Sequence, residues 1–225
     1  MSLHGTALIA IWHDLKPDNV DQFQRWHTEE HMPERLGVPG FLRGRRYMNW
    51  EQSPHVCFTI YEIAHMEVFR SPGYLARLNA PTEWSTRVQP GMTNFLRGPC
   101  ENVLSLGSGT GGAIATARIR IADAQSALTR RKLSAAALSL SGVPGITSVH
   151  LTRHELALSG LATSETALRP PSEPVAFDYL LMLEAIDVKT LQNETLRVNQ
   201  VLQDAGAMEV DIGCYALGFE LYAPH

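Results

Sequence analysis

Residues 26–31 read Trp-His-Thr-Glu-Glu-His and place two imidazoles four positions apart, with carboxylates between them. Residues four apart share a face of an α-helix, so His27 and His31 would follow each other along it. A histidine changes charge near neutral pH and suits acid–base catalysis, and two histidines at this spacing can also bind one zinc ion. The stretch therefore permits an acid–base site, a metal site or the solvated end of an ordinary helix.

The core-facing stripe of this predicted helix contains Val20, Phe23, His27, Glu30 and Glu34, with His31 at its edge. A helix that only supports the fold more often stays apolar along its buried face, whereas this stripe ends in a histidine and two glutamates. We therefore predict a polar pocket between helix and sheet. In the alternative interpretation the helix end projects into water, and Glu29 and Arg35 are ordinary solvated charges. The catalytic candidates are His27, His31, Glu30 and Glu34.

Residues 27–31 also match the H-x-x-E-H motif of inverted zinc proteases. The motif is short and occurs easily by chance, and the segments around it look ferredoxin-like rather than metalloprotease-like. We assign no metal ligands. Whether the histidine pair binds a divalent metal stays open.

A short sequence occurs twice in the chain. Residues 37–41 read GVPGF and residues 142–146 read GVPGI, at an offset of roughly 105 residues that is typical of an internal repeat. In the first copy Gly37 ends the helix, Pro39 keeps its predecessor extended, and Gly40 permits a turn into the next strand. The second copy keeps the same turn.

Strands and helices can be placed in the same order around both copies. In the first half, the expected strands are residues 6–15, 41–50, 55–63 and 93–106, and the expected helices are residues 16–36 and 66–79. In the second half, the expected strands are residues 113–121, 146–156, 176–186 and 210–222, and the expected helices are residues 127–142 and 187–206. Each half then has the strand–helix–strand–strand–helix–strand order of a ferredoxin-like unit.

The helices of such a unit cover one face of its sheet, and the other face must be covered too. We predict an α+β fold in which two tandem ferredoxin-like units pack sheet on sheet as a dimeric α+β barrel within one chain. The units are residues 1–106 and 113–225. The glycine-rich residues 107–112 form a flexible linker, and residues 156–175, rich in Ser, Thr and Pro, form a surface insertion.

Comparison of the two copies assigns the chemistry to the first half. At the repeat offset, the Trp-His pair at 26–27 meets Arg-Lys at 131–132, and the Glu-His pair at 30–31 meets Ala-Ala at 135–136. The acid–base groups are therefore present once. We expect the second half to be a scaffold, with His150 at its surface or edge.

Strand alternation groups four side chains on one face of the second strand, Phe41, Arg43, Arg45 and Tyr47. Trp12 on the first strand and Tyr61 on the third are either lining residues of an aromatic cavity or ordinary core residues. An arginine on the second strand would hold an enolate or carboxylate. The candidate substrate-binding residues are Trp12, Phe23, Trp26, Arg43, Arg45, Tyr47 and Tyr61.

Composition excludes several classes of protein. The 225 residues are 44% hydrophobic, enough for a substantial core, and 19 basic against 23 acidic residues give a net charge of −4. That charge argues against nucleic-acid binding. Three widely spaced cysteines do not form a disulfide framework, and the N-terminus lacks a signal peptide's basic region. With no membrane-length apolar run, we expect a soluble cytoplasmic protein.

The stretch W-H-x-E-E-H-M-P-E-R-L-x-V-P-G-F followed by R-x-R-R-Y resembles a signature of small bacterial members of the dimeric α+β-barrel superfamily. Those members are akin to EthD-like and antibiotic-biosynthesis-monooxygenase-like proteins of unknown function. The resemblance implies a small enzyme that acts on an aromatic or polyketide-like molecule without a cofactor, as an isomerase or oxygenase. In such an enzyme His27, or alternatively His31, would be the base, and Glu30 or Glu34 would orient it. The alternative is a non-catalytic module for a small ligand or for a stress response. The expected partners are a small-molecule ligand and a second copy in a homodimer.

Overall fold

The computed structural model describes residues 3–51, 55–171 and 177–224. Its strands close into a barrel in the order β1-β3-β2-β8-β5-β7-β6-β4, and every neighbouring pair is antiparallel. The strands of the first half are β1 (Ala7–Leu15), β2 (Phe41–Met48), β3 (Cys57–Ile63) and β4 (Met92–Gly107). Those of the second half are β5 (Ala113–Arg120), β6 (Ile146–His154), β7 (Tyr179–Ala185) and β8 (Glu209–Tyr222).

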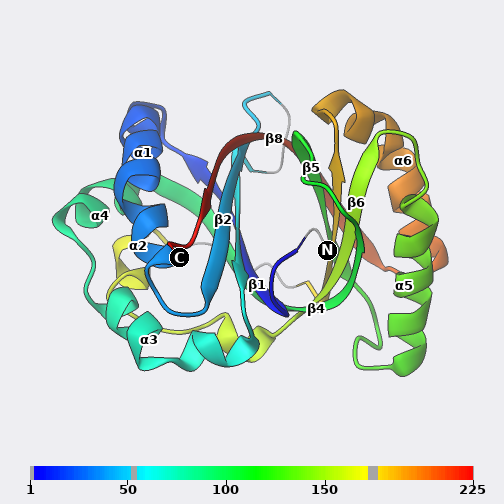
Figure 1. Ribbon diagram of the computed structural model, residues 1–225, viewed down its shortest axis with the longest axis horizontal. Helices are drawn as coiled ribbons and strands as arrows, with labels where there is room; N and C mark the ends of the chain where they lie inside the picture. The colour runs from blue at the N-terminus through cyan, green and yellow to red at the C-terminus, as the bar shows by residue number, and fades with distance from the viewer. Residues whose placement is uncertain (1–2, 52–54, 172–176, 225) are drawn as a thin grey trace.

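The helices of the two halves lie on opposite sides of the barrel (Figure 1). The first half carries α1 (Val20–Trp26), a π-helical turn (His27–His31), α2 (Met32–Leu36), α3 (Pro72–Asn79) and α4 (Glu83–Val88). The second half carries α5 (Ala127–Leu140) and α6 (Val188–Asp204). Each half therefore places helices on the outer face of a four-stranded sheet, and the predicted α+β class is confirmed.

The halves are joined along two seams of the barrel, β2 with β8 and β4 with β6. Apolar side chains from both halves meet in the barrel interior, among them Trp12, Phe58, Leu180 and Tyr215. Each sheet thus has one face toward this shared interior and one toward its own helices. Residues that alternate along a strand consequently reach two different environments.

The two GVPG turns have a shared backbone requirement. Gly40 and Gly145 have φ angles of +96° and +85°, in the left-handed region that favours glycine. Gly40 stands directly before β2 and Gly145 directly before β6. This conformation explains why both copies end in glycine.

The glycine-rich connection between β4 and β5 is held at two points. The backbone N–H of Gly111 donates to Glu184 Oε2 at 2.9 Å, and the Thr110 hydroxyl accepts from Arg43 Nη1 at 3.0 Å. Gly111 is buried against Ala185, where a Cβ would lie 2.4 Å from a carbonyl oxygen. The connection is therefore anchored to buried charges.

The insertion of the second half lies against the first half. Its described part contains short 3₁₀ turns at Leu156–Leu158 and Thr166–Leu168, and it runs among the helices of the first half (Figure 1). The Glu165 N–H donates to the Leu78 carbonyl at 2.9 Å. Leu158 packs in the hydrophobic cluster between the helices and the sheet of the first half. Residues 172–175 of the expected insertion, and residue 176 of the expected strand, lie outside the described residues.

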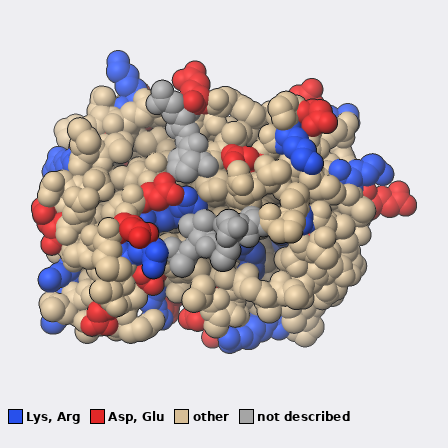
Figure 2. Space-filling model, turned by 180° about the vertical axis from the view of Figure 1, so that it is seen from behind, with Lys and Arg blue, Asp and Glu red and all other residues tan. Residues whose placement is uncertain are grey.

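Figure 2 shows a face that is mostly uncharged, on which basic and acidic side chains lie near one another at several separate places. Within residues 3–51, 55–171 and 177–224, no helix has both the length and the apolar character that a bilayer crossing requires.

Candidate functional site

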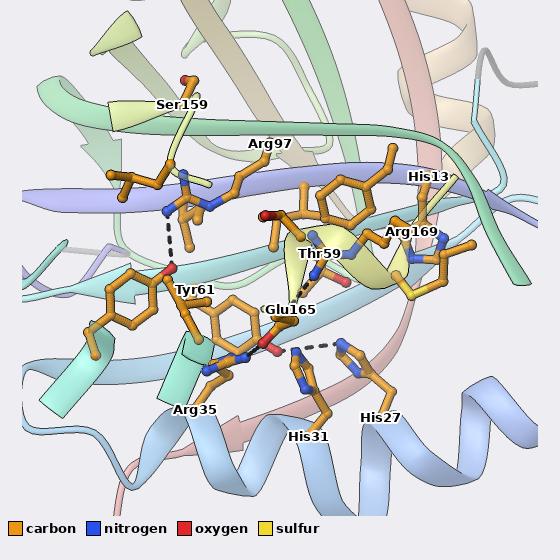
Figure 3. Close-up of a pocket in the computed structure, with 18 of the residues that line it drawn as sticks. His13, His27, His31, Arg35, Thr59, Tyr61, Arg97, Ser159, Glu165 and Arg169 are labelled. Atoms are coloured by element: carbon orange, nitrogen blue, oxygen red, sulfur yellow. Dashed lines mark hydrogen bonds and ion pairs between the residues drawn. The ribbon is translucent and has the colours of Figure 1, made fainter. Parts of the chain in front are cut away.

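A cavity of about 50 Å³ lies in the first half, between the β-sheet, the helix that contains the π turn, and the insertion (Figure 3). One water needs roughly 10–15 Å³ in such a cavity, so several waters fit. Strands β1 to β4 of the sheet contribute Ile9, Ile11, His13, Phe41, Thr59, Tyr61, Met92, Phe95 and Arg97. The helices contribute Trp26, His27, His31, Arg35, Tyr74 and Leu78, and the insertion contributes Ser159, Leu161, Glu165, Thr166 and Arg169.

The π-helical turn orients the side chains that reach this cavity. The backbone N–H of Met32 bonds to the carbonyl of His27, five residues earlier, whereas an α-helix would use the residue four earlier. The turn therefore holds one more residue and rotates the following helix. As a result His27, His31 and Arg35, spaced four apart, all line the cavity (Figure 3). Regular α-helical geometry does not predict this rotation, and π turns are frequent at functional sites.

His27 lies on the cavity wall opposite β3. Its Nε2 is 3.4 Å from the Tyr61 hydroxyl, and the donor between them depends on the tautomer of the imidazole. Burial, followed by the charge of Arg46, lowers the pKa of His27 well below 6.5, so the imidazole is neutral at neutral pH. Burial also raises the pKa of Tyr61, which keeps its proton. The pair is a neutral base beside a neutral hydroxyl.

His31 stacks on Trp26, with ring centroids 4.2 Å apart. Burial, followed by the charge of Arg35, lowers its pKa well below 6.5. The Nδ1 atoms of His27 and His31 are both buried, and within the described residues neither has a hydrogen-bond partner. Buried polar atoms normally have partners, so both imidazoles retain unused hydrogen-bonding capacity.

His13 is a cavity residue that the sequence analysis missed. It is 1% exposed, and its ring centroid lies 4.9 Å from that of Phe23 and 6.2 Å from that of Phe95. Burial lowers its pKa to about 4. The alternation of β1 does place His13 and Ile11 on the helix-facing side. That pattern was the available signal, since a histidine there must lie under the predicted helix.

Three arginines around the cavity were also missed. Arg35 forms an ion pair with Glu165 and is 4% exposed, so the solvated interpretation of this side chain is wrong. Arg169 bonds to the other Glu165 oxygen at 2.6 Å. Burial, Arg35 and Arg97 lower the pKa of Arg169 to about 9 despite this ion pair. Arg97 donates to the Leu158 carbonyl at 2.7 Å. Because the insertion brings Arg169 and Glu165 in from the second half, no local pattern indicates that these two charges reach the cavity.

Glu30 and Glu34 do not line the cavity. The Thr82 hydroxyl, at the N-terminus of α4, donates to Glu30 Oε1 at 2.5 Å. Glu34 lies 3.5 Å from Arg77 of α3. Both glutamates are only half-buried, because the π turn rotates them away from the sheet. The structure thus places them in contacts between helices.

Arg43, Arg45 and Tyr47 point into the barrel interior, on the opposite face of the sheet from His27. Arg45 is 0% exposed and lies 2.9 Å from both Glu62 and Glu184. Burial alone would raise the pKa of Glu184, but His150, Arg45 and the Gly111 N–H lower it to about 2.

Two expectations, for Phe41 and His150, need correction, and for Trp12 the structure favours the core alternative. Phe41 lines the cavity and does not share the interior face of Arg43, because the β2–β3 register shifts between these two residues. Trp12 lies in the barrel interior, where its Nε1 donates to Thr116 Oγ1 at 3.1 Å. His150 is 0% exposed, so the surface interpretation is wrong. Of the remaining candidates, Trp26 and Tyr61 line the cavity, and Phe23 packs behind His13 and His27.

The π turn also affects the comparison of the two halves. His31 matches Ala136 of α5, and both are buried. At the same offset His27 would match the exposed Lys132, whereas the buried residue of α5 at that level is Leu133. The extra residue of the π turn accounts for this slip of one position. His27 thus stands where the second half has an apolar core residue.

No group of three or more His, Cys, Asp or Glu side chains in the described part of the chain is arranged to hold a metal ion. The ring centroids of His27 and His31 are 5.8 Å apart, and their neighbours in the cavity are mainly arginine and aromatic side chains. Arginine does not bind metal cations, and its charge repels them. The environment therefore favours acid–base chemistry at this pair.

No family model and no curated protein sequence matches the chain. Among solved structures, an anthrone oxidase-like protein is similar with a TM-score of 0.64 and 8% identity, over 97% of this chain and 93% of that one. A putative monooxygenase from Lactobacillus acidophilus NCFM matches with a TM-score of 0.57 and 8% identity, over 97% of both chains. A mutant chlorite dismutase from Candidatus Nitrospira defluvii matches with a TM-score of 0.56 and 12% identity, over 96% and 92%.

The chain has the dimeric α+β-barrel fold. At 8–12% identity these likenesses concern the fold alone. Function must therefore be argued from the side chains of the cavity.

Proposed function

We propose that this protein is a small-molecule enzyme of the cofactor-independent oxygenase or isomerase type, acting on an aromatic compound in the cavity of the first half. His27 is the base that removes a proton from a phenol or an acidic C–H group. The observation that carries the proposal is the neutral, buried His27 imidazole on the cavity wall beside the Tyr61 hydroxyl. The anthrone oxidase-like and monooxygenase names of two fold neighbours support the oxygenase type.

The cavity suits proton abstraction in three ways. A neutral imidazole is ready to accept a proton at neutral pH. The aromatic rings of Trp26, Tyr61, Tyr74 and Phe95 offer flat surfaces to an aromatic substrate. Arg97 and Arg169 supply positive charge toward a developing phenolate or enolate.

The two reaction types differ in the fate of the substrate anion. In an isomerase, protonated His27 returns the proton to another carbon. In an oxygenase, the electron-rich anion is itself the reductant of dioxygen, so that a CH₂ group and O₂ yield C=O and H₂O. Neither balance requires a further reductant.

The size of the cavity requires a movement during binding. Its volume is about 50 Å³, whereas an engineered apolar cavity that binds benzene measures roughly 150 Å³. An aromatic substrate therefore needs more space than this conformation provides. The insertion is the wall that can supply it. Beside the buried ion pair of Glu165 with Arg35, its contacts with the first half include exposed polar bonds such as Ser164 N to Asn79 Oδ1 at 3.2 Å.

The test is turnover by His27→Ala. Anthrone and hydroxynaphthoquinone-type probes are incubated with the protein, and oxygen uptake and product are followed by oxygen electrode and mass spectrometry. We expect kcat/KM to fall about 10²–10⁴-fold in the variant, the usual contribution of a positioned base, while the melting temperature stays close to that of the wild type.

The matched control is His65→Ala, because the His65 side chain is 58% exposed and its Nδ1 bonds to the exposed Glu67. It should retain full turnover. Unchanged turnover in His27→Ala would remove His27 from the role of base. Binding of the probes without turnover by the wild type would instead favour the non-catalytic binding module. A homodimer and a cytoplasmic location stay predictions.

A further inference from the structure

The charges around the cavity do not balance. The described lining residues include three arginines, Arg35, Arg97 and Arg169, but a single carboxylate, that of Glu165. Glu165 already bonds to Arg35 and Arg169. The three cavity histidines do not alter this balance, because burial lowers the pKa of each. Buried charges are normally paired, so the wall carries positive charge that no described lining group neutralises.

The hydrogen bonds of these arginines also indicate that the cavity can bind an anion. Arg97 has two neutral partners: it donates to the Leu158 carbonyl at 2.7 Å and to the Tyr74 hydroxyl at 3.0 Å. Arg35 is 4% exposed, yet its Nη1 has no partner within the described residues. Nε of Arg169 is buried and likewise has none there. Guanidinium N–H groups are strong donors that favour carboxylate and phenolate oxygens.

The aromatic side chains of the cavity wall indicate the chemical character of the uncharged part of the ligand. Arg169 lies over the Phe95 ring, with its guanidinium carbon 3.9 Å from the centroid. Tyr74 and Phe41 lie with ring centroids 5.4 Å apart on the same wall. An anionic group near Arg97 and Arg169 would therefore be attached to an aromatic body, which would extend toward His27.

We propose that the cavity selects an aromatic carboxylate, whose carboxylate group is bound by Arg97 and Arg169 and competes with Glu165 for Arg169. This inference deepens the proposed function by naming the substrate class. In the present structure Glu165 supplies the negative charge from within the chain. It comes from the insertion, the same segment that must move to enlarge the cavity, so entry of the ligand and release of Glu165 would be coupled.

The experiment compares an anion with its neutral isostere. Binding of 1-naphthoate and 1-naphthamide is measured by calorimetry at low salt on the full-length protein. We expect the wild type to bind the carboxylate about tenfold more tightly or better, the difference that one charge-assisted hydrogen bond can provide. Arg97→Gln and Arg169→Gln should each reduce this preference to about one, and Arg169→Lys, which keeps the charge, should retain much of it.

Glu165→Gln separates this proposal from a purely structural role of the insertion. Loss of the internal carboxylate should raise the preference for naphthoate over naphthamide several-fold. If Glu165 only fastens the insertion, both ligands would change affinity together and the ratio would stay constant, which would overturn the competition. Arg120→Gln is the matched control, since Arg120 is half-exposed and pairs with Glu209 at 3.3 Å on the second half.

Equal binding of the two ligands by the wild type, or binding of neither, would overturn the anion site. Retention of the preference in both Arg97→Gln and Arg169→Gln would also overturn it. The outcome is distinct from that of the proposed function, because binding is measured without turnover and His27→Ala should leave the ratio unchanged. If the protein prefers the carboxylate but turns nothing over, the proposed enzymatic function is refuted and the anion site stands. If it turns substrate over but has no carboxylate preference, only the anion site is refuted.

Discussion

The two halves of this protein have the same order of elements but bury different side chains between helices and sheet. In the second half this interface is apolar, with Leu133, Ala137 and Leu140 of α5 packed with Leu191 and Leu202 of α6. In the first half the corresponding interface contains His13, His27, His31, Arg35 and Tyr61. The apolar half demonstrates what the fold itself requires.

This difference between the two interfaces indicates that the buried polar groups of the first half serve function and not folding. Burial of polar atoms without partners destabilises a protein, and the second half shows that the architecture forms without them. The cavity therefore occupies volume that core side chains fill in the other half. Departures from a consistently apolar core are expected at functional sites.

The largest effect should come from the barrel interior, which the two halves share. Arg45 of the first half contacts Glu184 of the second at 2.9 Å, and both side chains are 0% exposed. Arg45→Met leaves Glu62 and Glu184 buried without this partner, so we expect a loss of about 3–5 kcal/mol of unfolding free energy. Urea denaturation measures it, and both halves should unfold in one transition.

Arg120→Met provides the comparison for this variant, because its ion pair with Glu209 is half-exposed and should contribute less than about 1 kcal/mol. Two separate transitions in Arg45→Met would show that the halves are stable independently, and the comparison of two coupled halves would then fail.

The next effect is a pH dependence of stability that comes from His13 of the first half. Burial lowers the pKa of His13 from 6.5 to about 4, so between these values the unfolded chain binds a proton that the folded protein does not. The free energy of unfolding is therefore unaffected by this group above pH 6.5. It decreases as the pH falls toward 4, by about 3 kcal/mol in total.

His13→Gln should therefore lose less stability than the wild type between pH 7 and pH 4.5. Unfolding free energies from urea titrations at both pH values measure this difference. The exposed His65, replaced by Gln, should leave the wild-type dependence unchanged. Identical acid sensitivity of His13→Gln and the wild type would show that His13 is not held neutral.

The smallest effect is expected from His31→Leu, a substitution that makes the helix–sheet interface of the first half more like that of the second. His31 corresponds to Ala136 at the repeat offset, and its Nδ1 is buried with no partner in the described residues. His31→Leu removes an unsatisfied polar atom and keeps a side chain of similar volume against Trp26. We expect a gain of about 1 kcal/mol in unfolding free energy together with weaker turnover, measured by thermal unfolding and by the oxygen-uptake assay. A clear loss of stability would instead give His31 a structural role.

Much of the fold could be predicted from local patterns. The expected strand at residues 41–50 corresponds to β2, Phe41–Met48, and the expected helix at 187–206 corresponds to α6, Val188–Asp204. Both GVPG turns follow from the backbone freedom of glycine, with positive φ at Gly40 and Gly145. Hydrophobic period and turn residues are short-range signals that determine such elements. The short helix α4 at Glu83–Val88 was missed, since its sequence has little apolar periodicity.

The sequence by itself determined that His27 and His31 lie on a helix beside a sheet, since spacing and turn residues act over a few positions. Only the tertiary structure decided which neighbours they have. One extra residue in the π turn moves Arg35 into the cavity and Glu30 out of it. The partner of Arg35 is Glu165, 130 residues away. Because packing and charge pairing join segments irrespective of their distance along the chain, no local pattern contains that contact.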